Sequence, residues 1–138
     1  MLTIPKHFVD GMISHARAEK PLECCGILAG KDGTVTDMYK MNNTENDPDK
    51  YLMDAKEQFA VVKDMRAKGL DMLAIYHSHP HSPARPSGID TKLAFYPDAI
   101  YIIISLMDAE KPVMKGFFIK EEKVEEAVFA DESWTLIG

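Results

Sequence analysis

The segment LDMLAIYHSHPHSPARPSGID, residues 70–90, carries the most informative pattern of this 138-residue chain. Its mainly apolar start, residues 70–76, has the length and composition of a buried central strand. Three alternate histidines follow, then prolines, and then Ser87 and Asp90. Coordinating groups therefore crowd around the end of a buried strand. This pattern indicates a metal site, a phosphate-handling histidine triad, or a polar loop that merely contains histidine.

The overall composition is that of an ordinary globular protein, with 46% hydrophobic and 28% charged residues. A chain of this length is expected to form one domain, residues 1–138, with a core that needs no disulfide. The formal net charge of −6 and the pI near 5.3 argue against binding to nucleic-acid phosphates. Disordered and fibrous proteins are likewise poor matches to this composition.

The features that report on location favour the cytoplasm. The first twenty residues lack the continuous apolar segment of a secretory signal. The longest apolar run, residues 99–107, is too short to cross a bilayer as a helix. The two cysteines, Cys24 and Cys25, are adjacent in sequence and offer no disulfide framework. We therefore expect a cytoplasmic protein without membrane contact.

The order of the expected helices and strands predicts an α/β (α+β) fold, a mixed β-sheet flanked by helices in three layers. The expected helices are 5–19, a segment from the capping pair Asp54 and Glu57 to Gly69, and a short one from Ser87 to Phe95. The expected strands are 24–30, 34–41, 70–76, 99–107, 113–119 and 124–130, with a turn at 30–33 and an exposed loop at 42–49.

Two expectations concern the faces of the helices. Phe59, Val62 and Met65 share one face of the second helix, as residues at helical spacing do. His7 and His15 lie on the first helix and are expected to face solvent.

The last expected strand, 124–130, offers an edge through which the chain could form a homodimer.

The histidine pattern itself predicts a metal centre. Alternate residues of an extended segment point to the same side, so His77 and His79 present both imidazoles to one point. Two imidazoles suit zinc, and Asp90 is the natural third ligand, returned by a proline-stiffened loop. Three protein ligands leave a fourth position for water, whose pKa zinc lowers to about 7. Such a hydrolytic centre needs a general base, and the loop offers no other carboxylate.

Glu23 is the candidate base, since it stands at the entry to the expected strand 24–30, from which it could reach the metal-bound water. Glu23, then His77-Ser78-His79-Pro80, then Ser87 and Asp90 reproduce the pattern E…H-[ST]-H-P-x(6)-S-x(2)-D. This pattern resembles the motif of the JAMM (MPN-plus) zinc metalloproteases, in the form of a short prokaryotic-type member.

The resemblance implies an MPN-type, cytidine-deaminase-like fold over the whole chain. It implies that zinc is bound by His77, His79 and Asp90. It further implies that Glu23 passes a proton from water to the leaving amine, and that Ser87 hydrogen-bonds the tetrahedral oxyanion. The family cleaves amide or isopeptide bonds at the C-terminus of ubiquitin-like proteins. Its short members are similar to enzymes that trim a residue such as cysteine from the Gly-Gly end of sulfur-carrier proteins, and so compact a chain favours such a slim tail.

Each site residue also has a plainer interpretation. Ser-x-x-Asp before an apolar run is a helix capping box, and a capping Ser87 is not easily free to bind an oxyanion. Asp90 can face a metal while its charge still stabilises the first helical turn. Glu23 could be an ordinary surface carboxylate. His81 lies beyond Pro80, which interrupts the strand geometry, so we interpret it as a loop residue.

Three rival functions remain open. A histidine-triad nucleotide hydrolase would use the H-x-H-x-H pattern without metal, although Ser78 and Pro80 stand where apolar residues are expected. A non-catalytic MPN-type scaffold would share the fold but usually lacks a ligand or the glutamate. A cysteine hydrolase would use Cys24 or Cys25, although thiols in an apolar strand are expected to pack in the core.

Overall fold

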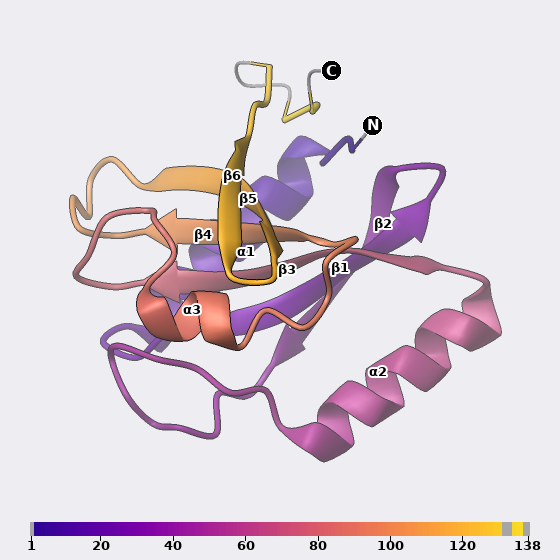
Figure 1. Cartoon of the computed structure of the whole chain (residues 1–138), viewed down its shortest axis with the longest axis horizontal. Helices are drawn as coiled ribbons and strands as arrows, with labels where there is room; N and C mark the ends of the chain where they lie inside the picture. Colours follow the sequence, from indigo (N-terminus) through magenta and orange to yellow (C-terminus); the bar gives the residue numbers. More distant parts are fainter. Residues whose placement is uncertain (1, 131–133, 137–138) are drawn as a thin grey trace.

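A six-stranded β-sheet forms the centre of the computed structural model, which describes residues 2–130 and 134–136 (Figure 1). The strands are β1 (Cys25–Lys31), β2 (Thr34–Met41), β3 (Asp71–His79), β4 (Ile100–Ser105), β5 (Val113–Lys120) and β6 (Lys123–Ala127). They lie in the order β2-β1-β3-β4-β5-β6. The central pair, β3 and β4, is parallel, and every other neighbouring pair is antiparallel.

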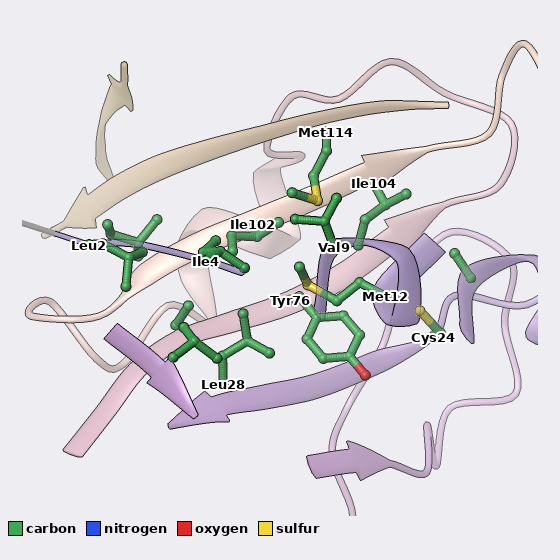
Figure 2. Packing of buried hydrophobic residues seen from close by; sticks show 14 of the residues in the cluster. Leu2, Ile4, Val9, Met12, Cys24, Leu28, Tyr76, Ile102, Ile104 and Met114 are labelled. Carbon is green, nitrogen blue, oxygen red and sulfur yellow. The ribbon is translucent and has the colours of Figure 1, made fainter. Parts of the chain in front are cut away.

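Helices pack on both faces of this sheet. They are α1 (Lys6–Glu19), α2 (Ala55–Lys68) and α3 (Gly88–Lys92). Figure 2 shows Val9 and Met12 of α1 among Tyr76, Ile102 and Ile104 of the sheet, in the larger core cluster. On the opposite face, smaller apolar clusters form under α2 and beside α3. The mixed sheet between two helical layers that the sequence predicts is therefore confirmed. In the residues described, the helices fall short of the length and hydropathy that crossing a membrane requires.

Local sequence signals account for the ends of α2 and for the first hairpin. The Asp54 carboxylate accepts a hydrogen bond from the Glu57 backbone N–H at 3.0 Å, which caps the first turn of α2. Gly69 ends the helix with a φ of 66°, a left-handed conformation that glycine adopts without steric cost. Asp32 and Gly33, with φ of 52° and 77°, form the tight turn between β1 and β2.

Three predicted boundaries are wrong. The last strand, expected over 124–130, ends at Ala127. Strand β3 runs through His79 instead of ending at residue 76, because β4 continues beside it and pairs Ser105 with His79. The histidines are therefore part of the sheet and do not lie beyond it. Helix α3 ends at Lys92 instead of Phe95. The backbone N–H of Tyr96 donates to the Tyr101 hydroxyl at 2.9 Å, which draws the chain away from the helix axis.

Two expected helix faces also differ. His15 does not face solvent: it is 6% exposed, and its Nδ1 lies 2.7 Å from the Tyr76 hydroxyl. A phenol on β3 thus gives this buried ring a hydrogen-bond partner, and burial lowers the pKa of His15. Phe59 does not share the packed face of α2 and is 68% exposed, because its position six residues before Met65 turns it about 120° away from the side that Met65 packs on the sheet.

Close packing against Tyr76 leads to a stability prediction. A Cβ at Gly26 would lie 2.2 Å from Cε2 of Tyr76, a ring that is fully buried and bonded to His15. We expect Gly26→Ala to lower the free energy of unfolding by about 1–3 kcal/mol, the usual cost of overpacking a core. Urea denaturation measures the change.

The matched control is Gly88→Ala, where an added Cβ meets no atom within 4 Å. The free energy of unfolding of this control should lie within about 0.5 kcal/mol of that of the unmodified protein. Equal stability of the two alanine variants would show that β1 does not depend on its close approach to Tyr76.

Candidate active site

Four buried polar residues meet at one end of the central strands. Glu23 stands two residues before β1, His77 and His79 end β3, and Asp90 lies in α3. All four are at most 7% exposed. One ligand atom of each lies within 4.8 Å of the ligand atoms of the other three. The structure therefore brings together the carboxylates and imidazoles that the sequence motif combines.

The pairing of β1 with β3 places Glu23 there. Cys25 is opposite His77 in the antiparallel register. One step further along, the Ser78 backbone N–H donates to the Cys24 carbonyl at 3.1 Å, and the Ser78 hydroxyl accepts from the Cys24 N–H at 2.8 Å. The chain at Glu23 is thereby held beside the end of β3 that carries the histidines. The sequence motif predicts the role of the two histidines but not this role of Ser78.

The two imidazoles and one carboxylate have the spacing of metal ligands. Nε2 of His77 and Nε2 of His79 are 3.1 Å apart, and they lie 3.2 and 3.0 Å from Oδ2 of Asp90. Tetrahedral zinc with bonds of about 2.0–2.1 Å separates its ligand atoms by roughly 3.3 Å. These three side chains therefore fit a zinc ion in both chemistry and spacing.

The protonation preferences of the site suit a cation. Burial opposes the charge of Asp90, but hydrogen bonds from the two histidines hold the pKa of its carboxyl well below its usual range. Burial lowers the pKa of His77. Burial also acts on His79, but its bonds to Asp90 and Pro83 raise its pKa overall. Asp90 is thus an anion at neutral pH, the form in which a carboxylate binds metal.

Glu23 differs from Asp90 because it is buried without a fixed partner. Its Oε1 meets no hydrogen-bond partner among the described residues. Burial raises the pKa of its carboxyl to about 8, although the positive charge of His79 opposes the rise. Two carboxyls in one site thus have pKa values displaced in opposite directions, a pattern that separates a permanent anion from a group able to carry a proton.

Ser87 begins α3 with the capping box that the sequence suggests. Its hydroxyl accepts from the Asp90 backbone N–H at 3.1 Å, and its own N–H donates to Oδ2 of Asp90 at 2.8 Å. The same Asp90 oxygen therefore caps the helix and faces both histidines. Capping uses the Ser87 hydroxyl as an acceptor, so that its proton remains available to a further acceptor. Ser87 can therefore cap α3 and still donate its proton to an oxyanion, which the sequence does not suggest.

The remaining candidates lie outside this group. His81 is exposed, as expected for a loop residue. Cys24 and Cys25 are buried free thiols whose pKa burial raises to about 12, which leaves little reactive thiolate and matches the expectation of core packing. Tyr51 was missed. Its ring stacks on His77 with centroids 4.5 Å apart, from a segment that carries no motif and follows a loop of turn residues.

Known proteins provide an independent comparison with this geometry. Prokaryotic homologs of the JAB domain form a family whose pattern matches residues 5–119. The chain belongs to this family. A CysO-cysteine peptidase of Mycobacterium tuberculosis is 36% identical to this JAB-domain chain over 128 residues, which cover 91% of the chain and 88% of the relative. A desampylase of Haloferax volcanii is 35% identical over 103 residues, which cover 70% and 74%.

Solved structures resemble this JAB-domain chain as well. The solution structure of a protein from Desulfitobacterium hafniense superposes with a TM-score of 0.82 and 46% sequence identity. The match covers 91% of this chain and 89% of the other. The family resemblance inferred from the motif, the fold class and the prediction of a peptidase are thereby confirmed. The metal and catalytic roles of the individual residues remain predictions.

The raised pKa of Glu23 predicts how pH affects the metal-free protein. The carboxyl has a pKa of about 8 when folded and an ordinary value of 4.5. Its contribution to stability is therefore complete below the ordinary value and is lost as the pH rises through the folded value. We expect Glu23→Gln to stabilise the metal-free protein more at about pH 9 than at about pH 4.

Thermal unfolding in the presence of a chelator, at both pH values, tests this expectation. The comparison variant is Glu110→Gln, in an exposed turn, which should change stability little at either pH. A gain for Glu23→Gln that is equal at the two pH values would mean that the carboxyl does not titrate as the burial argument requires.

Proposed function

We propose that this chain is a zinc-dependent peptidase that cleaves the amide or isopeptide bond at the C-terminal tail of a ubiquitin-like or sulfur-carrier protein. The observation that carries the proposal is that Glu23 is buried beside His77, His79 and Asp90, with an Oε1 that meets no hydrogen-bond partner among the described residues. The substrate class is supported by the names of the relatives, a CysO-cysteine peptidase and a desampylase.

The roles of the residues follow from this arrangement. His77, His79 and Asp90 would hold the zinc ion, which when bound activates a water molecule and polarises the scissile carbonyl. Glu23 accepts a proton from the attacking water, since its carboxylate is buried and has an oxygen without a partner. The same carboxyl then delivers the proton to the leaving amine. A pKa raised by burial to about 8 keeps both of its forms accessible near neutral pH.

Ser87 is proposed to donate its hydroxyl proton to the oxyanion. The capping bond from Asp90 holds the serine oxygen in place, and a donor fixed before the reaction costs no reorganisation when charge develops. In this proposal a helix start with an ordinary structural role also contributes the donor next to the metal ligands.

An apolar surface next to the site supports a protein substrate. A hollow of about 130 Å³ is lined by aromatic and aliphatic side chains, among them Tyr51, Leu52, Leu93 and Phe95. Leu52, Leu93 and Phe95 are 47%, 40% and 69% exposed. Tyr51 connects this hollow to the metal site, because its ring also contacts His77. An exposed apolar surface of this kind suits an apolar stretch of a protein tail better than a phosphate-bearing nucleotide.

A cytoplasmic location is part of the proposal, supported by the two free and buried thiols of Cys24 and Cys25. Absence of nucleic-acid binding is supported by the net charge of −6. A homodimer through segment 124–130 remains a prediction from the sequence.

The proposed function predicts that catalysis can be separated from metal binding. Glu23→Gln should retain one zinc per chain but lose hydrolysis by a factor of about 10²–10⁴, since the amide cannot move protons. Metal analysis gives the zinc content. Mass spectrometry of ubiquitin-like proteins with short C-terminal extensions gives the cleavage rate and the bond that is cut. Near-normal turnover would contradict the assigned mechanism.

Three measurements separate the proposed function from its three rivals. A chelator should abolish cleavage and added zinc should restore it, whereas a histidine-triad hydrolase would be unaffected. The Cys24→Ala, Cys25→Ala double variant should cleave normally if both thiols only pack in the core. Absence of zinc from the purified, zinc-supplemented protein would favour the non-catalytic scaffold.

A further prediction of the proposed function concerns the apolar surface. Phe95→Asp should raise KM about fivefold or more with little change in kcat, because the side chain contacts the tail and not the reacting bond. Val124→Asp is the matched control, an exposed apolar residue of edge strand β6. An unchanged KM for Phe95→Asp would show that the tail does not pass over this surface.

A further inference from the structure

The two histidine ligands are held in different ways. Nδ1 of His79 lies 2.8 Å from the Pro83 carbonyl, the usual arrangement in which a metal-binding imidazole donates its second N–H to a neighbour. Nδ1 of His77 is equally buried but meets no hydrogen-bond partner among the described residues. The orientation of the His77 ring about its own axis must therefore come from another contact.

Tyr51 makes that contact. Its ring stacks on the imidazole of His77 with centroids 4.5 Å apart and planes inclined by 26°. A ring lying nearly flat against the imidazole opposes tilting, because tilting would push one edge into the phenol face. This matters for Nε2 of His77, which lies 3.2 Å from Asp90 and turns away from it when the ring tilts. Stacked aromatic pairs are stabilising beyond the area that they bury.

Asn43 fixes the segment that carries Tyr51. Its Nδ2 donates to the Lys50 carbonyl at 3.0 Å, and its Oδ1 accepts from the Leu52 N–H at 3.0 Å. The residues on both sides of Tyr51 are thus bound by one amide. The same Nδ2 also donates to the Glu23 carbonyl at 3.1 Å. Tyr51 is therefore attached to the chain at Glu23, although no strand of the sheet contains it.

We propose that Tyr51 is a positioning residue of the metal centre, whose ring holds the His77 imidazole so that Nε2 faces the ion, while Asn43 keeps Tyr51 in place. The inference rests on the zinc site of the proposed function and requires nothing of the substrate. The stacking ring supplies the orientation that a hydrogen bond supplies for His79. A tyrosine that only formed a wall of the substrate hollow would leave metal affinity unchanged.

Zinc affinity, measured by competition with a chromophoric chelator, tests the proposal. Tyr51→Leu removes the flat ring and should weaken zinc binding about tenfold, the size of effect seen when an outer partner of a ligand is lost. Tyr51→Phe keeps the ring and should bind zinc as the unmodified protein does. In the cobalt-substituted protein, the visible absorption bands should shift for Tyr51→Leu and stay in place for Tyr51→Phe.

The matched control is Tyr39→Leu. Tyr39 is also half-buried, but its hydroxyl bonds Asp64 between β2 and α2, so its loss should leave zinc affinity unchanged. A second variant, Asn43→Asp, keeps the acceptor oxygen of Asn43 and loses both Nδ2 bonds. It should weaken zinc binding in the same direction as Tyr51→Leu without altering any ring, and it carries the test if Tyr51→Leu does not fold.

Two results would overturn the proposal. One is zinc affinity in Tyr51→Leu equal to that of the unmodified protein, which would leave Tyr51 without a role at the metal. The other is an equal loss in Tyr51→Phe and Tyr51→Leu, which would assign the effect to the hydroxyl instead of the ring. Failure of the zinc-loaded protein to cleave any tail would overturn the proposed function alone, because the affinity measurement needs no substrate.

Discussion

The register between β1 and β3 is the constraint on which the rest of the site depends. Two hydrogen bonds between Cys24 and Ser78, one to a backbone carbonyl and one to a hydroxyl, secure it at the end of the pair. Successive side chains of a strand point to opposite faces, so a slip by one residue would turn both histidines into the core under α1. The hydroxyl of Ser78, between the histidines, thus helps to keep Glu23 aligned with His77 and His79.

Burial then separates the two carboxyls chemically. Asp90 receives hydrogen bonds from a helix start and faces two imidazoles, so that it remains charged in spite of burial. Glu23 receives no such support, and burial displaces its pKa upward to about 8. The difference comes from position alone, since the two groups have nearly the same intrinsic acidity. One buried site thereby suits the two roles proposed for its carboxyls, a fixed ligand and a proton carrier.

Much of this could be predicted from the sequence because the signals are local. The capping pair of α2, Gly69, and the alternation of His77 and His79 each specify a geometry within a few residues. What escaped prediction depends on partners distant in sequence. β3 continues through the histidines because β4 extends beside it. His15 is buried beside Tyr76, 61 residues later, whose hydroxyl pairs with its Nδ1. Tyr51 reaches His77 through an asparagine whose bonds span 20 residues, which no periodicity encodes.

The placement of His77 and His79 inside the sheet has a consequence for how the centre opens. Central strands exchange their amide protons only through nearly global unfolding, whereas short peripheral elements open locally at much lower free energy. Of the three proposed ligands, His77 and His79 belong to the first class, and Asp90, on a five-residue helix, belongs to the second. The slowly opening and the easily opening parts of the proposed metal site are therefore different segments of the chain. At the proposed metal site, an ion would therefore exchange through opening of α3, while His77 and His79 keep their positions in the sheet.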